Sequence, residues 1–186
     1  MAKQTWIGLV RGINVGGAHI VPMAKLRELL ETAGFSNVRT YIQSGNIVAK
    51  STLKNRDKVA AKIADVIESE FGFRPAVLVL SEKEMRSALV ENPFPQAESE
   101  PKTLHFYFLQ SAGATLNEAE FQKFAAANEQ YCLKNSVFYF YAPDGIGRSK
   151  LAGKVEKLLG VPTTARNLAS VLAVVDLARD PPPSPR

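Results

Sequence analysis

The segment Arg11–Gly17 is the part of the sequence best suited to bind a ligand, because it combines an arginine, an asparagine and three glycines. Closely spaced glycines let backbone N–H groups approach an anion, and the amino end of a following helix adds positive partial charge. A guanidinium group donates paired hydrogen bonds to phosphate or carboxylate. The segment therefore predicts anion binding, and a tight turn at positive φ is the structural alternative.

The glycine spacing matches neither of the two common nucleotide motifs. Gly12, Gly16 and Gly17 do not form G-x-G-x-x-G. Gly12 and Gly17 have the spacing of a Walker motif, but Ala18 and His19 stand where lysine and serine or threonine are required. A Mg-nucleotide hydrolase of that kind is therefore disfavoured.

Few other residues have a spacing that suggests chemistry. His19 and His105 are the two histidines, and neither has metal-ligand spacing to the single cysteine, Cys132. We therefore predict no metal and no cofactor. The sequence contains no G-x-S-x-G elbow, which excludes an α/β-hydrolase. Ser44 precedes a glycine, which is typical of a turn residue and not of a catalytic nucleophile. The sequence therefore leaves open whether the chain is an enzyme.

The elements that position these residues follow a regular order in the first half. Apolar periodicity and turn residues predict a strand, a helix, two strands, a second helix and a fourth strand. The ranges are Thr5–Val10, Pro22 to Gly34, Val38–Ile42, Ile47–Lys50, Asn55 to Gly72 and Ala76–Leu80. This β-α-β-β-α-β order is typical of a ferredoxin-like fold. A capping box at Ser81–Glu84 predicts a further short helix through Val90.

The pattern restarts after polar residues 96–102. It gives a strand, a helix, two strands, a helix, an extended piece and a last helix. The markers are Thr103–Leu109, a cap at Asn117, Tyr131–Lys134, Val137–Tyr141, Leu151–Leu159, Val161–Thr164 and a start at Asn167. We predict an α+β protein of two ferredoxin-like halves with additional helices. The predicted domains are 1–95 and 103–180, with 96–102 as linker and 181–186 as a disordered tail.

Topology predicts two groups of polar residues. The first two strands of such a unit are parallel, so the Arg11–Gly17 loop and the Gln43–Asn46 turn lie at one end of the sheet. The same logic brings Arg148–Lys150 to Arg166 and Asn167. The resulting candidate ligand-binding residues are Arg11, Asn14, Gly16, Gly17, Gln43, Ser44, Asn46, Arg148, Lys150, Arg166 and Asn167. We expect the two groups to form one site between the halves.

Aromatic residues alternate along two strands of the second half. We expect His105, Tyr107, Tyr139 and Tyr141 to share the open sheet face, while the intervening phenylalanines face the helices. RNA-recognition sheets stack bases on such aromatics, but the Arg/Lys-Gly-Phe/Tyr signature is missing. Packing of half-buried tyrosines is the simpler interpretation.

Bulk properties narrow the class of partner. The formal net charge is +5, the pI is about 9.3, and residues 134–166 hold six basic against two acidic side chains. Such a stretch is either a solvated helix face or a surface that attracts phosphates. No apolar run approaches the roughly 18 residues that span a bilayer, and one cysteine permits no internal disulfide. We therefore expect a cytoplasmic protein without a membrane partner, and its oligomeric state stays open.

Several motifs together resemble a known family. They are Arg11–Gly17, Val21–Met23 with Leu26, Tyr41–Asn46, Asn92–Phe94, Arg148–Leu151 and Thr164–Asn167. Through these motifs the chain resembles the bacterial family called domain of unknown function 1697. The resemblance extends from about residue 5 to residue 180. The resemblance implies two ferredoxin-like halves and no assigned activity. The family usually has an aromatic residue after the Arg-Asn pair, where this chain has Leu168.

The sequence thus favours a binding module for an anionic ligand, such as a nucleotide, a nucleic acid or another phosphate-bearing molecule. One alternative is an enzyme for a small phosphorylated or carboxylated metabolite, with Arg11 and Arg166 holding it and Ser44 or Ser149 reacting. Another alternative is a protein-interaction scaffold, which a large exposed apolar patch would indicate.

Overall fold

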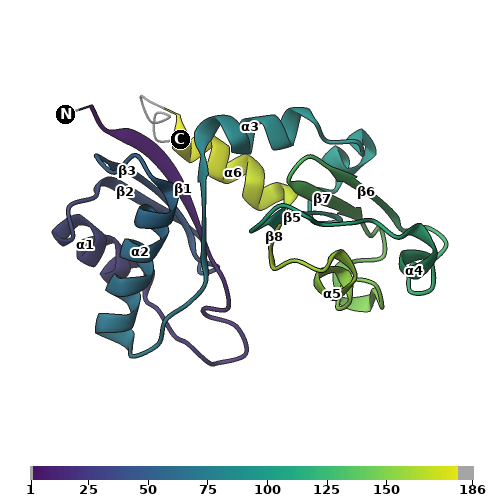
Figure 1. Cartoon of the computed structure of the whole chain (residues 1–186), viewed down its shortest axis with the longest axis horizontal. Helices are drawn as coiled ribbons and strands as arrows, with labels where there is room; N and C mark the ends of the chain where they lie inside the picture. The colour runs from purple at the N-terminus through teal and green to yellow at the C-terminus, as the bar shows by residue number, and fades with distance from the viewer. Residues whose placement is uncertain (1, 180–186) are drawn as a thin grey trace. The chain divides into compact units, whose positions relative to one another are not determined.

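The computed structural model describes residues 2–179, and the predicted tail 181–186 lies outside these residues. The chain forms two compact units. The first consists of Met1–Ser87 together with Leu172–Arg186, and the second of Ala88–Val171. Each unit contains one four-stranded antiparallel sheet with helices (Figure 1). Within residues 2–179, no helix combines the length and apolar character that crossing a membrane requires.

The first unit has the element order predicted from the sequence. Its elements are β1 (Gln4–Val10), α1 (Met23–Thr32), β2 (Ser36–Tyr41), β3 (Asn46–Ser51), α2 (Arg56–Phe71) and β4 (Val77–Ser81). The strand order is β2-β3-β1-β4, and every neighbouring pair is antiparallel. Helices α1 and α2 cover one face of this sheet (Figure 1). Their buried Leu26, Leu30 and Ile63 pack with Trp6 and Val10 of β1 in one core.

The helix ends follow the capping residues recognised in the sequence. Asn55 accepts hydrogen bonds from the backbone N–H groups of Asp57 and Lys58 at the start of α2. Gly72 ends that helix at a φ of 77°. Ser81 and Glu84 form the reciprocal capping box that opens α3 (Glu82–Val90). These local rules fix where α2 begins and ends and where α3 begins after β4.

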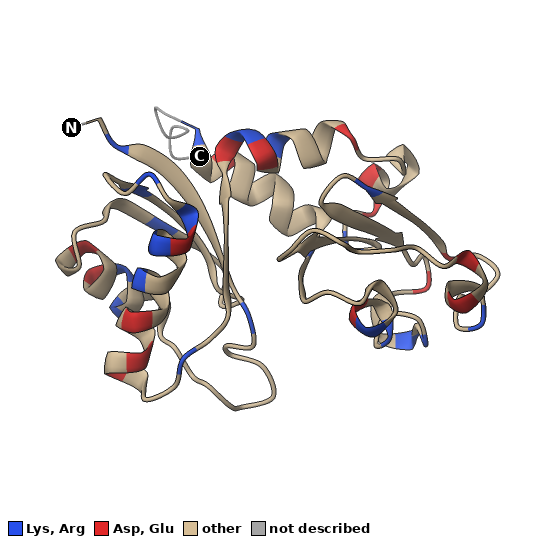
Figure 2. Ribbon diagram, viewed as in Figure 1, with Lys and Arg blue, Asp and Glu red and all other residues tan. Residues whose placement is uncertain are grey.

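The second unit repeats this order of strands and helices. Its elements are η1 (Pro95–Ser99), β5 (Leu104–Leu109), α4 (Glu118–Gln122), β6 (Gln130–Lys134), β7 (Val137–Tyr141), η2 (Ile146–Arg148), α5 (Val155–Leu159) and β8 (Thr163–Asn167). Helix α6 (Leu168–Ala178) begins in the second unit, and its residues from Leu172 onward belong to the first. The strand order is β6-β7-β5-β8, again antiparallel. The predicted helix over 151–159 is shorter than expected, because turns occupy the residues before Val155. Basic side chains lie on the segment leading into α5 (Figure 2).

The expected division of aromatic faces in the second sheet is wrong. His105 pairs with Phe140, and Tyr107 with Phe138, so these residues share one face. Side chains alternate between the two faces along each strand, as predicted. The register, however, places the odd-numbered residues of β5 opposite the even-numbered residues of β7. Tyr107 is 7% exposed and Tyr139 is fully buried. An open face of tyrosines for stacking bases therefore does not exist on these two strands.

Candidate functional site

The end of β1 lies between the β2–β3 turn and the segment that enters β4. The backbone N–H of Val10 donates to the carbonyl of Gly45 at 2.8 Å. The N–H of the next residue, Arg11, donates to the carbonyl of Ala76 at 2.9 Å. The topological prediction that the Arg11–Gly17 loop adjoins the Gln43–Asn46 turn is therefore confirmed.

Asn14 holds this loop together. Its Nδ2 donates to the carbonyls of Val21 (3.0 Å) and Gln43 (2.8 Å), and its Oδ1 accepts from the N–H of Val21 (2.8 Å). Its backbone takes a φ of 56°, a conformation that asparagine tolerates better than most residues. The side chain predicted to bind a ligand thus joins the two ends of the loop to the neighbouring turn.

Gly16 and Gly17 form the tip of a small hairpin. The N–H of Asn14 donates to the carbonyl of His19 at 3.1 Å, and Val15 pairs with Ala18. The two glycines have φ values of 62° and 78°, and two-residue hairpin turns of this type require positive φ at both positions. Helix α1 begins only at Met23, with Pro22 as its N-cap, so its amino end does not adjoin the glycines. The turn requirement accounts for them.

The β2–β3 turn is equally constrained. A Cβ on Gly45, which has a φ of 74°, would come within 2.8 Å of Val10 Cβ. Buried Asn46 donates to Ser44 Oγ at 2.9 Å, so the Ser44 hydroxyl takes part in the turn. Ile42 takes a φ of 47°, which is rare for a β-branched residue, and is 54% exposed. Strained residues held in this way concentrate at functional sites.

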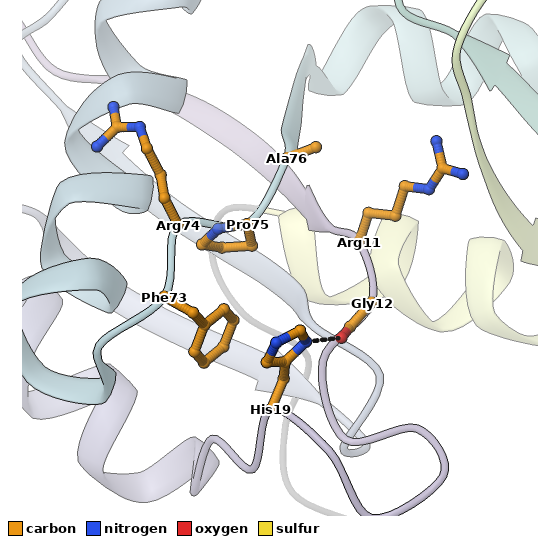
Figure 3. A pocket seen from close by; sticks show the side chains of 7 residues that line it. All are labelled: Arg11, Gly12, His19, Phe73, Arg74, Pro75 and Ala76. Carbon is orange, nitrogen blue, oxygen red and sulfur yellow. Dashed lines mark hydrogen bonds between the residues drawn. The ribbon is translucent and has the colours of Figure 1, made fainter.

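A pocket of about 340 Å³ opens beside this loop (Figure 3). It is lined by Arg11, Gly12, His19, Phe73, Arg74, Pro75 and Ala76. The rings of His19 and Phe73 stack with centroids 4.2 Å apart and planes at 19°. His19 Nδ1 lies 3.2 Å from the carbonyl oxygen of Gly12, and that oxygen can only accept, so Nδ1 carries the hydrogen. The ring is therefore held on its face and at its edge.

Two arginines, Arg11 and Arg74, line the pocket. Arg74 Nη1 contacts Asp65 Oδ1 at 2.5 Å and Glu68 Oε2 at 2.7 Å. The hydrogen bond to Asp65, followed by the one to Glu68, raises the pKa of Arg74 above its ordinary value. Two carboxylates already offset this charge. Arg11 is exposed, and its side chain extends away from Arg74 (Figure 3). Arg11 thus gives the pocket a second guanidinium group, directed to the other side.

The sequence interpretation did not include the residues from Phe73 to Ala76 in the site. The signal was present, because β4 is antiparallel to β1 and the register pairs Val10 with Val77. The chain entering β4 must therefore lie where β1 ends, at the same end of the sheet as Arg11. His19 was considered only as a metal ligand, so its stacking role was missed.

The second predicted group lies in the second unit. Strands β7 and β8 both end beside the start of β5, since Tyr141 pairs with Leu104 and Asn167 with His105. The segments that follow β7 and β8 therefore leave the same end of the sheet. Arg148 and Lys150 in the first of these segments are exposed. Ser149 Oγ accepts a hydrogen bond from the N–H of Ala152 at 3.0 Å, as a local turn contact.

Arg166 and Asn167 close β8 in different ways. Burial lowers the pKa of Arg166 to about 10, and its Nη1 donates to the carbonyl of Ala165 at 2.8 Å. Asn167 Oδ1 accepts from the N–H of Ser170 at 2.9 Å and so caps α6, as the sequence predicted. That the two groups form one site stays a prediction. Leu168, where the resembling family usually has an aromatic, is 2% exposed and is a core residue.

Comparison with known proteins gives a family and a fold. A family model described as "Protein of unknown function (DUF1697)" matches residues 3–139. The structure of a conserved bacterial protein, SP0830 from Streptococcus pneumoniae, is similar with a TM-score of 0.72 and 22% sequence identity. The similarity covers 96% of this chain and 100% of that chain, and at this identity it shows a shared fold. No curated protein matches.

Proposed function

Because the chain belongs to the DUF1697 family, whose function is unknown, we propose a function from the pocket itself: its first unit binds an anionic ligand that carries a flat ring, such as a nucleotide. The observation that carries this proposal is the stacked pair of His19 and Phe73 beside Arg11 in one pocket. Arg11 would hold the phosphate, and the ligand ring would extend the stack.

The physical chemistry of the pocket supports this assignment. A volume of about 340 Å³ lies in the range of small-ligand sites. Stacking of a base on an aromatic side chain contributes about 1–3 kcal/mol, and a guanidinium group suits phosphate oxygens. Arg11 lines the pocket and is exposed, so we expect anion binding to depend on its guanidinium group. The element order and the strand order of each unit also support our proposal that both units are ferredoxin-like.

The test compares adenosine monophosphate, adenosine, inorganic phosphate and a short single-stranded DNA by calorimetry and thermal unfolding. We expect the nucleotide to bind more tightly than adenosine or phosphate alone. At a concentration 100 times its Kd it should stabilise the protein by about 2.7 kcal/mol. Arg11→Ala and His19→Ala should each weaken binding at least tenfold. Tighter binding of the DNA would identify a nucleic-acid surface instead.

Lys58→Ala is the matched control, because Lys58 is an exposed basic residue of the same unit that does not line the pocket. It should leave nucleotide affinity within twofold of the wild type. An equal loss in Lys58→Ala and Arg11→Ala would mean general charge attraction. If none of the probes binds at millimolar concentration, the proposal is wrong.

A protein-interaction surface is the second candidate, and one observation favours it. Val15, Ile20 and Ile42 are 68%, 59% and 54% exposed, and all three lie on the two loops that Asn14 joins. Exposed apolar side chains that gather in one place mark contact sites. Sedimentation velocity of the wild type and of Val15→Ser/Ile20→Ser tests this candidate. If the wild type self-associates and the double variant does not, the interaction surface is supported. If the two proteins bind the nucleotide equally well, the surface and the nucleotide pocket act independently.

A further inference from the structure

A second pocket, of about 510 Å³, lies in the second unit and is separate from the site proposed above. Carboxylates, aromatic rings and amides form its lining: Glu118, Glu129, Phe94, Tyr131, Gln122 and Gln130, with the alanines of 125–127 between them. No lysine, arginine or histidine is among the lining residues. The pocket therefore has negative charge in a chain whose net charge is +5.

Each of the two carboxylates has one oxygen engaged within the protein. Glu118 Oε2 accepts from the Tyr131 hydroxyl at 3.0 Å, and Glu129 Oε2 accepts from the N–H of Ala126 at 2.9 Å. These bonds orient both groups. Within the described part of the chain neither carboxylate forms an ion pair. By contrast Glu120, which lies on α4 as Glu118 does, pairs with Lys123 at 2.5 Å. The negative charge of the pocket is thus not balanced locally.

The charge of the carboxylates reaches the phenols around them. Burial, the hydrogen bond to Glu118 and the charge of Glu118 together raise the pKa of Tyr131 to about 12. Burial and the charge of Glu129 raise the pKa of Tyr107 to about 12. Both phenols therefore stay neutral at physiological pH. The charge that a ligand meets in this pocket comes from the two glutamates.

The aromatic walls are held in place by neighbouring rings. Phe94 stacks on Tyr141 with centroids 6.1 Å apart, and Tyr131 packs against Phe121 at 5.2 Å. Phe94 is 7% exposed, so its position is set by packing. Aromatic faces attract cations, and their apolar surface suits the alkyl chain of an organic cation. Oriented carboxylates next to fixed rings suit a ligand with a charged head and an apolar stem.

We propose that this pocket binds an organic cation that bears a primary ammonium or guanidinium group. The charged group lies between Glu118 and Glu129, and its alkyl stem lies against Phe94 and Tyr131. A free polyamine and the side chain of a lysine or arginine in a peptide share this chemistry. The amides of Gln122 and Gln130 provide acceptors for the remaining N–H groups.

The experiment titrates the full chain with spermidine and, separately, with N-acetyl-lysine methylamide. Amide chemical shifts follow binding by NMR, and calorimetry gives the affinities. We expect shifts at 125–131 and at the side-chain amides of Gln122 and Gln130. The double variant Glu118→Gln/Glu129→Gln should weaken binding at least tenfold. Glu118→Gln alone, which changes an exposed residue, should weaken it about threefold if the double variant fails to fold.

Glu120→Gln is the matched control, since Glu120 lies on α4 but does not line the pocket. It should bind within twofold of the wild type. Tighter binding of spermidine would identify a free polyamine as the ligand, and equal or tighter binding of the lysine amide would identify a peptide side chain. Either result supports the proposal. Three results would overturn it. The first is that neither probe shifts any amide signal at 5 mM, on the order of the weakest specific affinities. The others are that Glu120→Gln loses as much affinity as the double variant, or that MgCl₂ causes the same chemical-shift changes as the two probes.

Discussion

Asn14 donates its side-chain amide to the backbone carbonyl of Gln43 at 2.8 Å, and this bond joins two loops 29 positions apart in the sequence. The same side chain makes two more hydrogen bonds with Val21. Together with the bond from the N–H of Val10 to the carbonyl of Gly45, this carboxamide sets the position of the loop that lines the proposed nucleotide pocket relative to the β2–β3 turn. A residue that reads as a ligand contact in the sequence is, in the fold, the residue that holds the loop in place.

Replacing Asn14 by alanine should destabilise the protein by about 2 kcal/mol more than replacing Asn37 by alanine. Each lost hydrogen bond costs about 0.5–1.5 kcal/mol, and Asn14 makes three. Asn37 is the control, because it also has a positive φ, of 51°, and the cost of that conformation then cancels. Urea unfolding measures both variants. Equal effects of the two substitutions would show that the carboxamide of Asn14 does not stabilise the loop.

Replacing Gly45 by alanine should cost about 3 kcal/mol, against about 1 kcal/mol for Gly17→Ala. Both glycines have positive φ, of 74° and 78°, so both variants include the conformational cost. Only at Gly45 would the new Cβ meet other atoms, with Val10 Cβ at 2.8 Å and Ile13 Cδ1 at 3.0 Å. Thermal unfolding of the two variants gives the difference. A smaller loss at Gly45 would mean that the two loops do not approach this closely.

Acidification should destabilise the protein through His105. Burial lowers the pKa of His105 to about 4, although a backbone hydrogen bond with Thr103 opposes the shift, and an unfolded histidine has a pKa of about 6.5. The unfolded state therefore binds the proton first, and stability present above pH 6.5 is lost as the pH falls towards 4. The full loss is about 3 kcal/mol.

The comparison variant for this effect is His105→Gln, which removes the titrating group. Its unfolding free energy should change less between pH 6.5 and 4 than that of the wild type, as measured by urea unfolding at several pH values. Parallel pH profiles for the two proteins would exclude His105 as the source.

Replacing Glu84 by alanine should cost about 1 kcal/mol at pH 7, the typical effect of a lost helix cap. Burial alone would raise the pKa of Glu84, but hydrogen bonds from Ser81 and the guanidinium of Arg56 outweigh it and lower the pKa. The stabilisation is therefore present above the ordinary carboxyl pKa and is lost as the pH falls through the lowered value. Glu82→Ala is the control, since Glu82 contacts Arg86 but not Ser81. Urea unfolding at a series of pH values below 7 should show the difference shrink as the pH falls through the lowered pKa.

The order of elements could be predicted because each helix or strand carries its own signal. Asn55 and Gly72 bound α2, and Ser81 with Glu84 opens α3, through contacts within a few residues. The adjacency of the Arg11–Gly17 loop and the Gln43–Asn46 turn followed from strand direction alone. Predicting these parts of the fold requires no knowledge of how side chains pack.

The register between strands and the pocket could not be predicted in the same way. Alternation along β5 and β7 says which residues of one strand share a face, but the offset that pairs Tyr107 with Phe138 is set by distant packing. The stack of His19 on Phe73 likewise joins residues from two separate loops. The role of Gly16 and Gly17 depended on α1 beginning at Met23, which the glycines themselves do not reveal.

The first unit is discontinuous in the sequence, because it combines Met1–Ser87 with Leu172–Arg186. A ribosome therefore releases all of the second unit before it releases the last segment of the first. The sheet of β1 to β4 leaves the exit tunnel early, but its unit is incomplete until the residues from Leu172 onward have been made. The second unit, continuous from Ala88 to Val171, is complete sooner. Although it is encoded later, it is the unit that can finish folding first on the ribosome.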